Sequence, residues 1–177
     1  MSRIIVYFHG YKGSPDSPKV QRLKEAFPND TVVAFPVDVN PAIAIAQVGD
    51  QIDLTLMDDL LSDEKMVFVG TSLGGWLAGK MALMYGCQAV LINPSVDPAT
   101  TLGKYGVPEN ITKLYTPLDK FPMDWKFFFA RNDEVLPNES LIYDLKLGGC
   151  DVTVSETAGH RFDGEEFEAV VKYLQHS

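Results

Sequence analysis

A serine flanked by glycines is the first feature of the sequence that could carry out chemistry. The apolar run KMVFVG leads directly into GTSLGGWLAGKMAL, so Gly70, Ser72 and Gly74 form a GxSxG pattern between a predicted strand and a predicted helix. In such a nucleophile elbow the serine has a strained backbone, and only glycine leaves room two residues to either side. We therefore predict that Ser72 is a nucleophile. The alternatives are a plain tight turn or a phosphate-binding loop, although the GxGxxG spacing of dinucleotide folds is absent.

The choice of a general base for this serine is narrow, because the chain has three histidines. His176 is the penultimate residue, and His9 closes the first predicted strand. His160 lies in ETAGHRF, between the last predicted strand and the last predicted helix, at the sheet edge where Ser72 also lies. This position suits a base, so we expect His160 to accept the serine proton. His9 is expected to form hydrogen bonds within its own loop, and a catalytic His9 is the alternative.

A carboxylate is needed to orient the imidazole and to stabilise the imidazolium. Asp133 follows a predicted strand in FFFARNDEVLP, in the loop next to the one that carries His160. The chain order Ser, Asp, His is that of α/β hydrolases. We therefore predict Asp133 as the acid, with Asp97 and then Glu134 as alternatives.

Two backbone amides could stabilise the negative charge that develops on a substrate carbonyl. The N–H of Leu73 lies at the start of the helix that follows the nucleophile, where the helix dipole favours an anion. The N–H of Tyr11 lies in the loop YFHGYKGSP, which is adjacent to the elbow if the first and third strands are neighbours. Gly10 would let this backbone approach closely, so Leu73 and Tyr11 are the predicted oxyanion-hole donors.

Six short segments rich in Val, Ile and Phe must position these residues. Most are continuous apolar runs, as strands covered on both faces by helices require. With helical patterns between them, they predict an α/β fold: a doubly wound, mostly parallel sheet of about six strands with helices on both faces. The pocket should lie beyond the carboxyl ends of the strands. The predicted strands are residues 3–8, 31–35, 66–69, 88–92, 126–129 and 151–155.

Residue pairs that favour helix starts lie between these strands. Ser17-Pro18, Asn40-Pro41 and Asn138-Glu139 each combine an N-cap type with proline or an acidic residue in the first turn. Asp163, with Glu166 three residues further on, has the spacing of a capping box and predicts the start of the last helix. Each strand is therefore expected to be followed by a helix.

One segment breaks this alternation. Residues 93–124 are rich in proline, show no sustained period, and are too long for an ordinary connection between neighbouring elements. We interpret this segment as a small cap over the pocket. At 177 residues, the rest of the chain fits one α/β domain, so residues 1–177 are expected to form a single domain.

Composition narrows the class of partner. Lys and Arg number 15 against 24 Asp and Glu, which gives a net charge of -9 and a pI near 4.7. This balance disfavours a nucleic-acid or anionic-membrane surface and favours a small-molecule partner. Cys87 and Cys150 have neither metal-ligand nor disulfide-framework spacing. The N-terminal residues have the pattern of a strand and show no signal-peptide cleavage site. No apolar run approaches the ~20 residues that are needed to span a bilayer. We therefore expect a cytoplasmic protein.

Five motifs together resemble a known family. They are YFHGYKGSP, GTSLGGW, LINPSV, NDEVLP and AGHRF, in chain order over nearly the whole sequence. The combination is similar to the small bacterial α/β-hydrolase-fold esterases of the YqiA and YcfP type. The resemblance implies a minimal α/β-hydrolase fold, a triad of Ser72, Asp133 and His160, and no metal or organic cofactor. The segment 93–124 matches least.

The sequence therefore predicts a serine hydrolase that cleaves a carboxylic ester or thioester through an acyl-enzyme intermediate. The short chain and small cap favour small or medium acyl groups. The alternative is a catalytically silent hydrolase-fold protein that serves in binding or interaction, because a fold does not guarantee turnover. The sequence leaves the oligomeric state and the physiological substrate open.

Overall fold

A parallel sheet of six strands runs through the centre of the computed structural model, which describes residues 3–60 and 65–177. The strand order is β2-β1-β3-β4-β5-β6, and every neighbouring pair is parallel. The predicted doubly wound α/β fold is confirmed, and two strands extend slightly beyond their predicted ends. The strands are β1 (Arg3–Phe8), β2 (Thr31–Phe35), β3 (Lys65–Thr71), β4 (Gln88–Ile92), β5 (Lys126–Ala130) and β6 (Asp151–Ser155).

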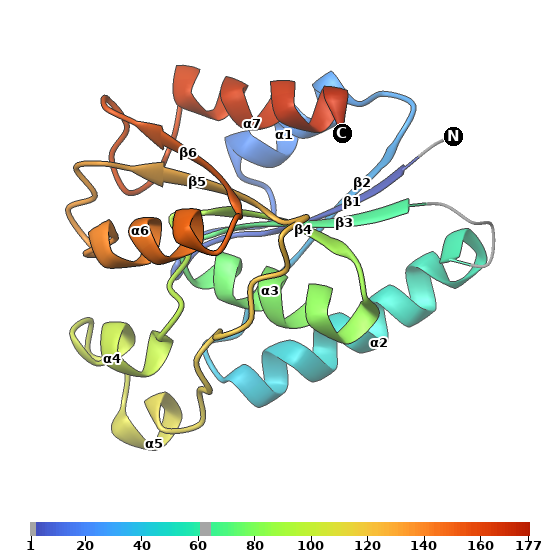
Figure 1. The fold of residues 1–177 in the computed structure, drawn as a ribbon. Coiled ribbons are helices and arrows are strands. Elements are labelled where there is room, and N and C mark those ends of the chain that lie inside the picture. Colours follow the sequence, from blue (N-terminus) through green and yellow to red (C-terminus); the bar gives the residue numbers. More distant parts are fainter. Residues whose placement is uncertain (1–2, 61–64) are drawn as a thin grey trace.

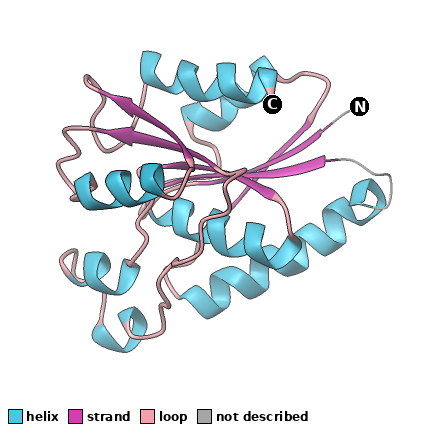
Figure 2. Ribbon diagram, viewed as in Figure 1, coloured by secondary structure: helices cyan, strands magenta, loops and turns pink. Residues whose placement is uncertain are grey.

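Helices cover both faces of this sheet (Figure 1). α1 and α7 pack on one face, and α2, α3 and α6 pack on the other, so the strands form a middle layer (Figure 2). α4 and α5 lie to one side, in the connection between β4 and β5. The helices are α1 (Pro18–Ala26), α2 (Pro41–Leu60), α3 (Leu73–Tyr85), α4 (Pro98–Gly103), α5 (Glu109–Thr112), α6 (Glu139–Leu147) and α7 (Glu165–His176).

The alternation of side chains along each strand supplies two cores. In β1, Ile4 and Val6 pack with the core beneath α2 and α3, while Ile5 and Tyr7 pack with the core beneath α1 and α7. All four are at most 2% exposed. Burial of each such aliphatic side chain contributes about 1.5–3 kcal/mol. Two buried faces explain why the strands read as continuous apolar runs.

The predicted helix starts are correct for α1, α2 and α6, the last of which begins at Glu139 with Asn138 as its N-cap residue. α1 begins at Pro18, directly after Ser17, and α2 begins at Pro41. The Asn40 side chain accepts a hydrogen bond from the N–H of Ala42 at 3.0 Å. Proline at the first helical position costs little, because that N–H has no partner within the helix.

The predicted start of the last helix is wrong in its capping residue. Gly164, not Asp163, precedes α7, with a φ of 66° and no side-chain cap. The Asp163 carboxylate instead accepts a hydrogen bond from Lys19 Nζ on α1 at 2.6 Å, and Glu166 accepts one from Thr157 Oγ1 at 3.1 Å. The positively charged Lys19 on α1 thus binds the Asp163 carboxylate, which the sequence pattern predicted as the helix cap.

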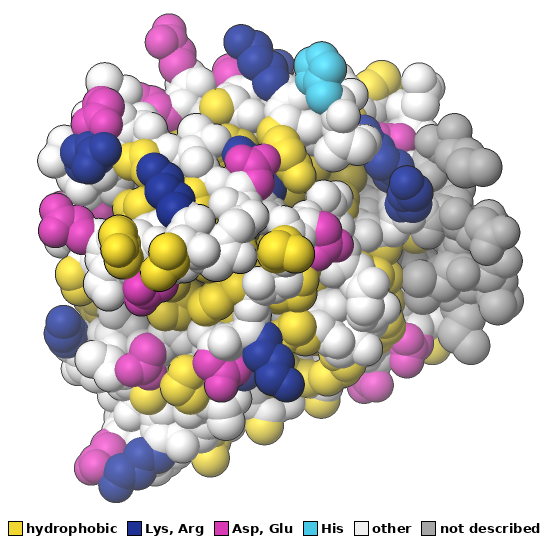
Figure 3. All heavy atoms as spheres, viewed as in Figure 1, with side chains coloured by type: hydrophobic (Ala, Val, Ile, Leu, Met, Phe, Trp, Pro, Cys, Tyr) yellow, Lys and Arg dark blue, Asp and Glu magenta, His cyan; other side chains and the backbone are white. Residues whose placement is uncertain are grey.

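The surface mixes charges of both signs. Figure 3 shows Lys and Arg side chains among Asp and Glu on the face in view, with apolar side chains between them. This face therefore has no uniformly basic patch of the kind that neutralises phosphates. Among residues 3–60 and 65–177, no helix is both long enough and apolar enough to cross a membrane.

The carboxyl ends of three neighbouring strands meet at one edge. Phe8 of β1 lies opposite Gly70 of β3, and Thr71 lies opposite Ile92 of β4. Past the strand ends, the N–H of Ser72 donates to the Ile92 carbonyl at 3.0 Å. The loops after β1, β3 and β4 are thus held side by side.

Close packing at this edge depends on two glycines. A Cβ added to Gly70 would lie 2.1 Å from the carbonyl oxygen of Gly74. A Cβ added to Gly74 would lie 2.2 Å from the carbonyl oxygen of Phe8 and 2.5 Å from that of His9. Real Cβ atoms do not approach backbone oxygens so closely, so these glycines allow α3 to begin directly against the end of β1.

Gly74→Ala is expected to destabilise the protein by more than about 3 kcal/mol or to prevent folding, because backbone atoms of β1 would have to move. Urea unfolding followed by circular dichroism measures the change. Gly103→Ala is the matched control, because nothing lies within 4 Å of its added Cβ, and it should leave stability unchanged or slightly higher. Equal stabilities of the two variants would contradict the packing argument.

Candidate active site

Ser72 occupies a sharp turn between β3 and α3. Its backbone has φ 56° and ψ -118°, a region that a residue with a side chain rarely adopts. The Ser72 carbonyl accepts hydrogen bonds from Ser95 N–H at 3.0 Å and Gly75 N–H at 2.9 Å, which hold the turn in place. Strain of this kind costs roughly 1–3 kcal/mol and is often stored at functional sites.

The strain predicts an unusual order of stabilities. Ser72→Gly should be more stable than Ser72→Ala by about 1 kcal/mol, because glycine relieves the strain but loses more entropy on folding. Thermal and urea unfolding of both variants measure the difference. At Ser140, an exposed residue of α6, the order should be reversed, because glycine disfavours a helix by about 1 kcal/mol relative to alanine. The same order at both positions would argue against strain at Ser72.

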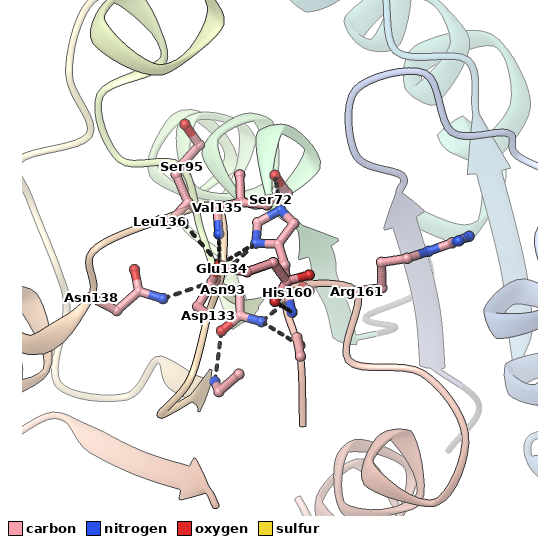
Figure 4. Close-up of polar contacts among 12 residues, drawn as sticks. Ser72, Asn93, Ser95, Asp133, Glu134, Val135, Leu136, Asn138, His160 and Arg161 are labelled. Carbon is pink, nitrogen blue, oxygen red and sulfur yellow. Dashed lines mark hydrogen bonds and ion pairs between the residues drawn. The ribbon is translucent and has the colours of Figure 1, made fainter. Parts of the chain in front are cut away.

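The structure brings Ser72, His160 and Asp133 into one continuous hydrogen-bonded chain. His160 Nε2 lies 2.9 Å from Ser72 Oγ, and His160 Nδ1 lies 2.9 and 2.8 Å from the two Asp133 oxygens. Because a carboxylate can only accept, Nδ1 carries a proton and Nε2 of the neutral ring accepts from the serine hydroxyl. Figure 4 shows the His160 ring between the other two side chains, and Arg161 directed away from them.

Asp133 is held as a buried carboxylate. Its side chain is 1% exposed, and burial, the largest single influence, raises its pKa. Hydrogen bonds from His160 and from the N–H groups of Leu136 and Val135 outweigh burial, so the pKa of Asp133 lies below its usual value. Asn138 Nδ2 also donates to Asp133 Oδ2 at 3.1 Å. The carboxylate is therefore fixed in position and kept charged.

Neither alternative acid contacts the imidazole within the described residues. Asp97 precedes α4 and accepts a hydrogen bond from Thr100 Oγ1 at 2.6 Å. Glu134 Oε2 instead accepts a hydrogen bond from the backbone N–H of His160 at 3.0 Å. Of the three candidates, only Asp133 touches the ring.

His9 is engaged at both ring nitrogens. The N–H of Val37 donates to Nε2 at 3.2 Å, and Nδ1 lies 2.8 Å from the carbonyl oxygen of Gly10. The Nδ1 proton must therefore be donated to that oxygen, and the ring is neutral. His9 thus bonds within its loop and to the segment after β2, as expected, and it has no free nitrogen for proton transfer.

The loop after β1 lies directly beside Ser72. A Cβ on Gly10 would be 3.3 Å from Ser72 Cβ. The Gly10 carbonyl accepts from both His9 and Gly13, so the trans peptide directs the N–H of Tyr11 to the opposite side. Among the hydrogen bonds of the described residues, the N–H groups of Tyr11 and Leu73 have no acceptor, which is what a donor to a substrate requires.

A cavity of about 1170 Å³ opens at this edge of the sheet. Ser72, His160, Tyr11 and Leu73 are among the residues that line it. On one side it is bounded by residues of the segment 93–124, and on the other by α1 and the start of α7. The lining from the first side includes Ser95, Leu102 and Tyr105, and that from the second includes Lys19 and Phe167. This volume is more than a small acyl group requires.

Two side chains at the site were missed or misassigned from the sequence. Asn93 contacts the backbone that carries His160, and Glu134 was considered only as an alternative acid. The one available signal for Asn93 was its place directly after β4 in LINPSV, at the edge where Ser72 lies. Within residues 3–60 and 65–177, no group of three or more His, Cys, Asp or Glu side chains is arranged to hold a metal ion.

The parallel sheet, the sharp turn at Ser72 and the order of the loops define an α/β-hydrolase-fold protein. Solved structures have the same fold: an esterase of Pyrococcus furiosus, with a TM-score of 0.72 and 16% identity, matches 99% of this chain and 81% of that chain. An esterase of Pyrobaculum calidifontis has a TM-score of 0.67 and 20% identity, and the match covers 99% of this chain and 75% of that chain.

The chain belongs to the uncharacterised protein family UPF0227, whose pattern matches residues 4–175. A UPF0227 protein of Yersinia enterocolitica is 25% identical over 170 residues, which covers 90% of this chain and 91% of the relative. The family resemblance found in the sequence is therefore confirmed.

Proposed function

We propose that the protein is a serine hydrolase that cleaves a carboxylic ester or thioester through an acyl-enzyme intermediate. The observation that carries the proposal is the unbroken chain of hydrogen bonds from Ser72 Oγ through His160 to the buried Asp133 carboxylate. A proton can pass along the first of these bonds only because Asp133 fixes the imidazole tautomer.

In the first half of the reaction, Ser72 Oγ attacks the acyl carbon while His160 Nε2 takes the hydroxyl proton. The negative charge on the tetrahedral intermediate is stabilised by the N–H groups of Leu73 and Tyr11. Asp133 stabilises the imidazolium that forms. His160 then returns the proton to the leaving alcohol or thiol, and the acyl group remains on Ser72.

In the second half, water attacks the acyl carbon while His160 takes a water proton. As the second tetrahedral intermediate collapses, His160 returns that proton to Ser72 Oγ, which restores the hydroxyl and releases a carboxylic acid. Apart from the substrate and water, these steps are written with side chains and backbone amides of this chain. We assign the segment 93–124 as a small cap on a single domain, since its residues bound one side of the cavity.

The strained backbone of Ser72 supports turnover over a silent binding role. A binding protein would gain stability from a relaxed residue at this position, whereas a nucleophile requires the elbow to expose its hydroxyl. The joint presence of the serine, the base and the acid supports the same choice.

The test is hydrolysis of p-nitrophenyl acetate and butyrate, together with labelling of the intact protein by a fluorophosphonate, in which Ser72 Oγ displaces fluoride from phosphorus. We expect release of p-nitrophenolate and one label per chain, mapped to Ser72 by peptide mass spectrometry. Acyl thioesters of the same chain lengths, followed by thiol release, compare the two substrate classes. A folded protein that neither hydrolyses these substrates nor takes up the label would favour the binding or interaction role.

A further inference from the structure

We propose that Asn93 is a positioning residue for the general base: it fixes the backbone of the loop that carries His160, and so sets the distance from His160 to Ser72. The inference rests on the proposed function, in which His160 must stay within hydrogen-bond distance of the nucleophile. Asn93 itself touches neither Ser72 nor the imidazole in the described hydrogen bonds.

The Asn93 side chain bridges two loops at the carboxyl edge of the sheet. Its Nδ2 donates to the carbonyl oxygen of His160 at 2.8 Å, with a longer contact of 3.4 Å to that of Gly159. Its Oδ1 accepts from the N–H of Ala130, the last residue of β5, at 2.8 Å. The residue is 0% exposed, so water does not compete for these bonds. Asn93 therefore links the loop that carries His160 to the end of β5, a strand that is paired on both sides (Figure 4).

A second side chain holds the same residue from the other side. Glu134 Oε2 accepts from the backbone N–H of His160, while Asn93 donates to the backbone carbonyl of His160. The peptide groups on both sides of the His160 Cα are thus fixed by side chains rather than by a strand or a helix. These two side-chain bonds are important because His160 lies in the loop between β6 and α7, so the backbone hydrogen bonds of a strand or helix do not position it. A misplacement of about 1 Å in a reacting group can cost about 100-fold in rate.

The requirements at position 93 explain the choice of asparagine. The backbone there has a φ of 41°, a region that asparagine tolerates better than most residues with a side chain. The contacts demand a donor toward one loop and an acceptor toward the other, which a planar amide supplies from a single side chain. An aspartate would keep the acceptor to Ala130 and the shape, but its second oxygen would face the His160 carbonyl without a proton to donate.

Asn93→Asp therefore tests the donor alone. We expect kcat for p-nitrophenyl butyrate to fall about 10- to 100-fold at pH 8, with KM nearly unchanged, because the loss affects the placement of the base. Asn29→Asp is the matched control: it makes the same chemical change on an exposed residue before β2, at the opposite edge of the sheet, and should keep wild-type kinetics. Urea unfolding of both variants checks that the proteins remain folded.

The pH dependence separates positioning from a general loss of structure. The titratable groups around position 93 are His160 on the base loop and Asp133 and Glu134 on the loop after β5 (Figure 4). Burial and the two nearby carboxylates should raise the pKa of the new carboxyl group. When that group is protonated it can again donate to the His160 carbonyl. The activity of Asn93→Asp relative to wild type should therefore rise as the pH is lowered from 8 to 6.

A readout that needs no turnover is the ¹⁵N spectrum of the three histidines. In wild type, His160 should show a protonated Nδ1 and an acceptor Nε2, and in Asn93→Asp these signals should shift or broaden at pH 8. Unchanged His160 signals, or a wild-type kcat and pH profile in the folded Asn93→Asp protein, would overturn the positioning role. An inactive, unlabelled wild type would instead overturn the proposed function, and the ¹⁵N comparison would still decide whether Asn93 positions His160.

Discussion

Ser72→Ala is expected to lower kcat for p-nitrophenyl butyrate by on the order of 10⁶-fold, the loss seen when the nucleophile of a Ser-His-Asp system is removed. His160 Nε2 contacts the Ser72 hydroxyl and is oriented by Asp133 from the other side, so alanine removes the group that the base would activate. The fold should be retained, since the turn is held by backbone bonds of the Ser72 carbonyl and N–H, which alanine keeps.

Spectrophotometric assays and fluorophosphonate labelling measure this effect side by side. Ser140→Ala, on the exposed surface of α6, is the matched control and should keep wild-type activity and one label per chain. The double variant Ser72→Ala with His160→Ala should be no slower than Ser72→Ala alone, because the two residues act as a unit. Substantial hydrolysis by purified Ser72→Ala would show that the nucleophile lies elsewhere.

The course of the strands could be predicted because they are short segments rich in Val, Ile and Phe, a length and composition that favour strands over helices. Residues 89–92, for example, are apolar at every position, which disfavours an exposed strand and indicates that helices cover both faces. The strand ends were less certain. β3 continues to Thr71, a polar residue that pairs with Ile92 of β4 and whose hydroxyl bonds to Tyr7 at 3.0 Å. That partner lies on another strand, so the local pattern carried no sign of it.

The three central residues of the site could be predicted for a similar reason. In a parallel α/β sheet, all loops after strand carboxyl ends meet at one edge, so chain order alone brings Ser72, Asp133 and His160 near each other. The structure gives them the distances that this reasoning could not. The contacts of Asn93 and Glu134 could not be predicted, because both side chains bond to the backbone of His160. Backbone N–H and carbonyl groups are common to nearly all residues, so the sequence does not indicate which of them a side chain will contact.

Asp133→Asn is expected to lower kcat by about 10⁴-fold through a change of tautomer. Asp133 Oδ1 accepts the N–H groups of Val135 and Leu136, so the remaining oxygen of the new amide should stay there. The amide nitrogen then takes the place of Oδ2: it donates to His160 Nδ1 and can no longer accept the hydrogen bond from Asn138 Nδ2. The imidazole must carry its proton on Nε2, where it faces the Ser72 hydroxyl and cannot accept a proton from it.

Steady-state kinetics with p-nitrophenyl butyrate measure the loss of rate, and the ¹⁵N spectrum of His160 measures the change of tautomer. We expect KM to change little and the ring signals to exchange the protonated nitrogen from Nδ1 to Nε2. Asp97→Asn is the matched control, since Asp97 contacts Thr100 and not the imidazole, and its remaining oxygen can still accept that bond. If Asp97→Asn were the slower variant, the acid would lie on the loop after β4; if both kept wild-type rates, His160 would work without a carboxylate partner.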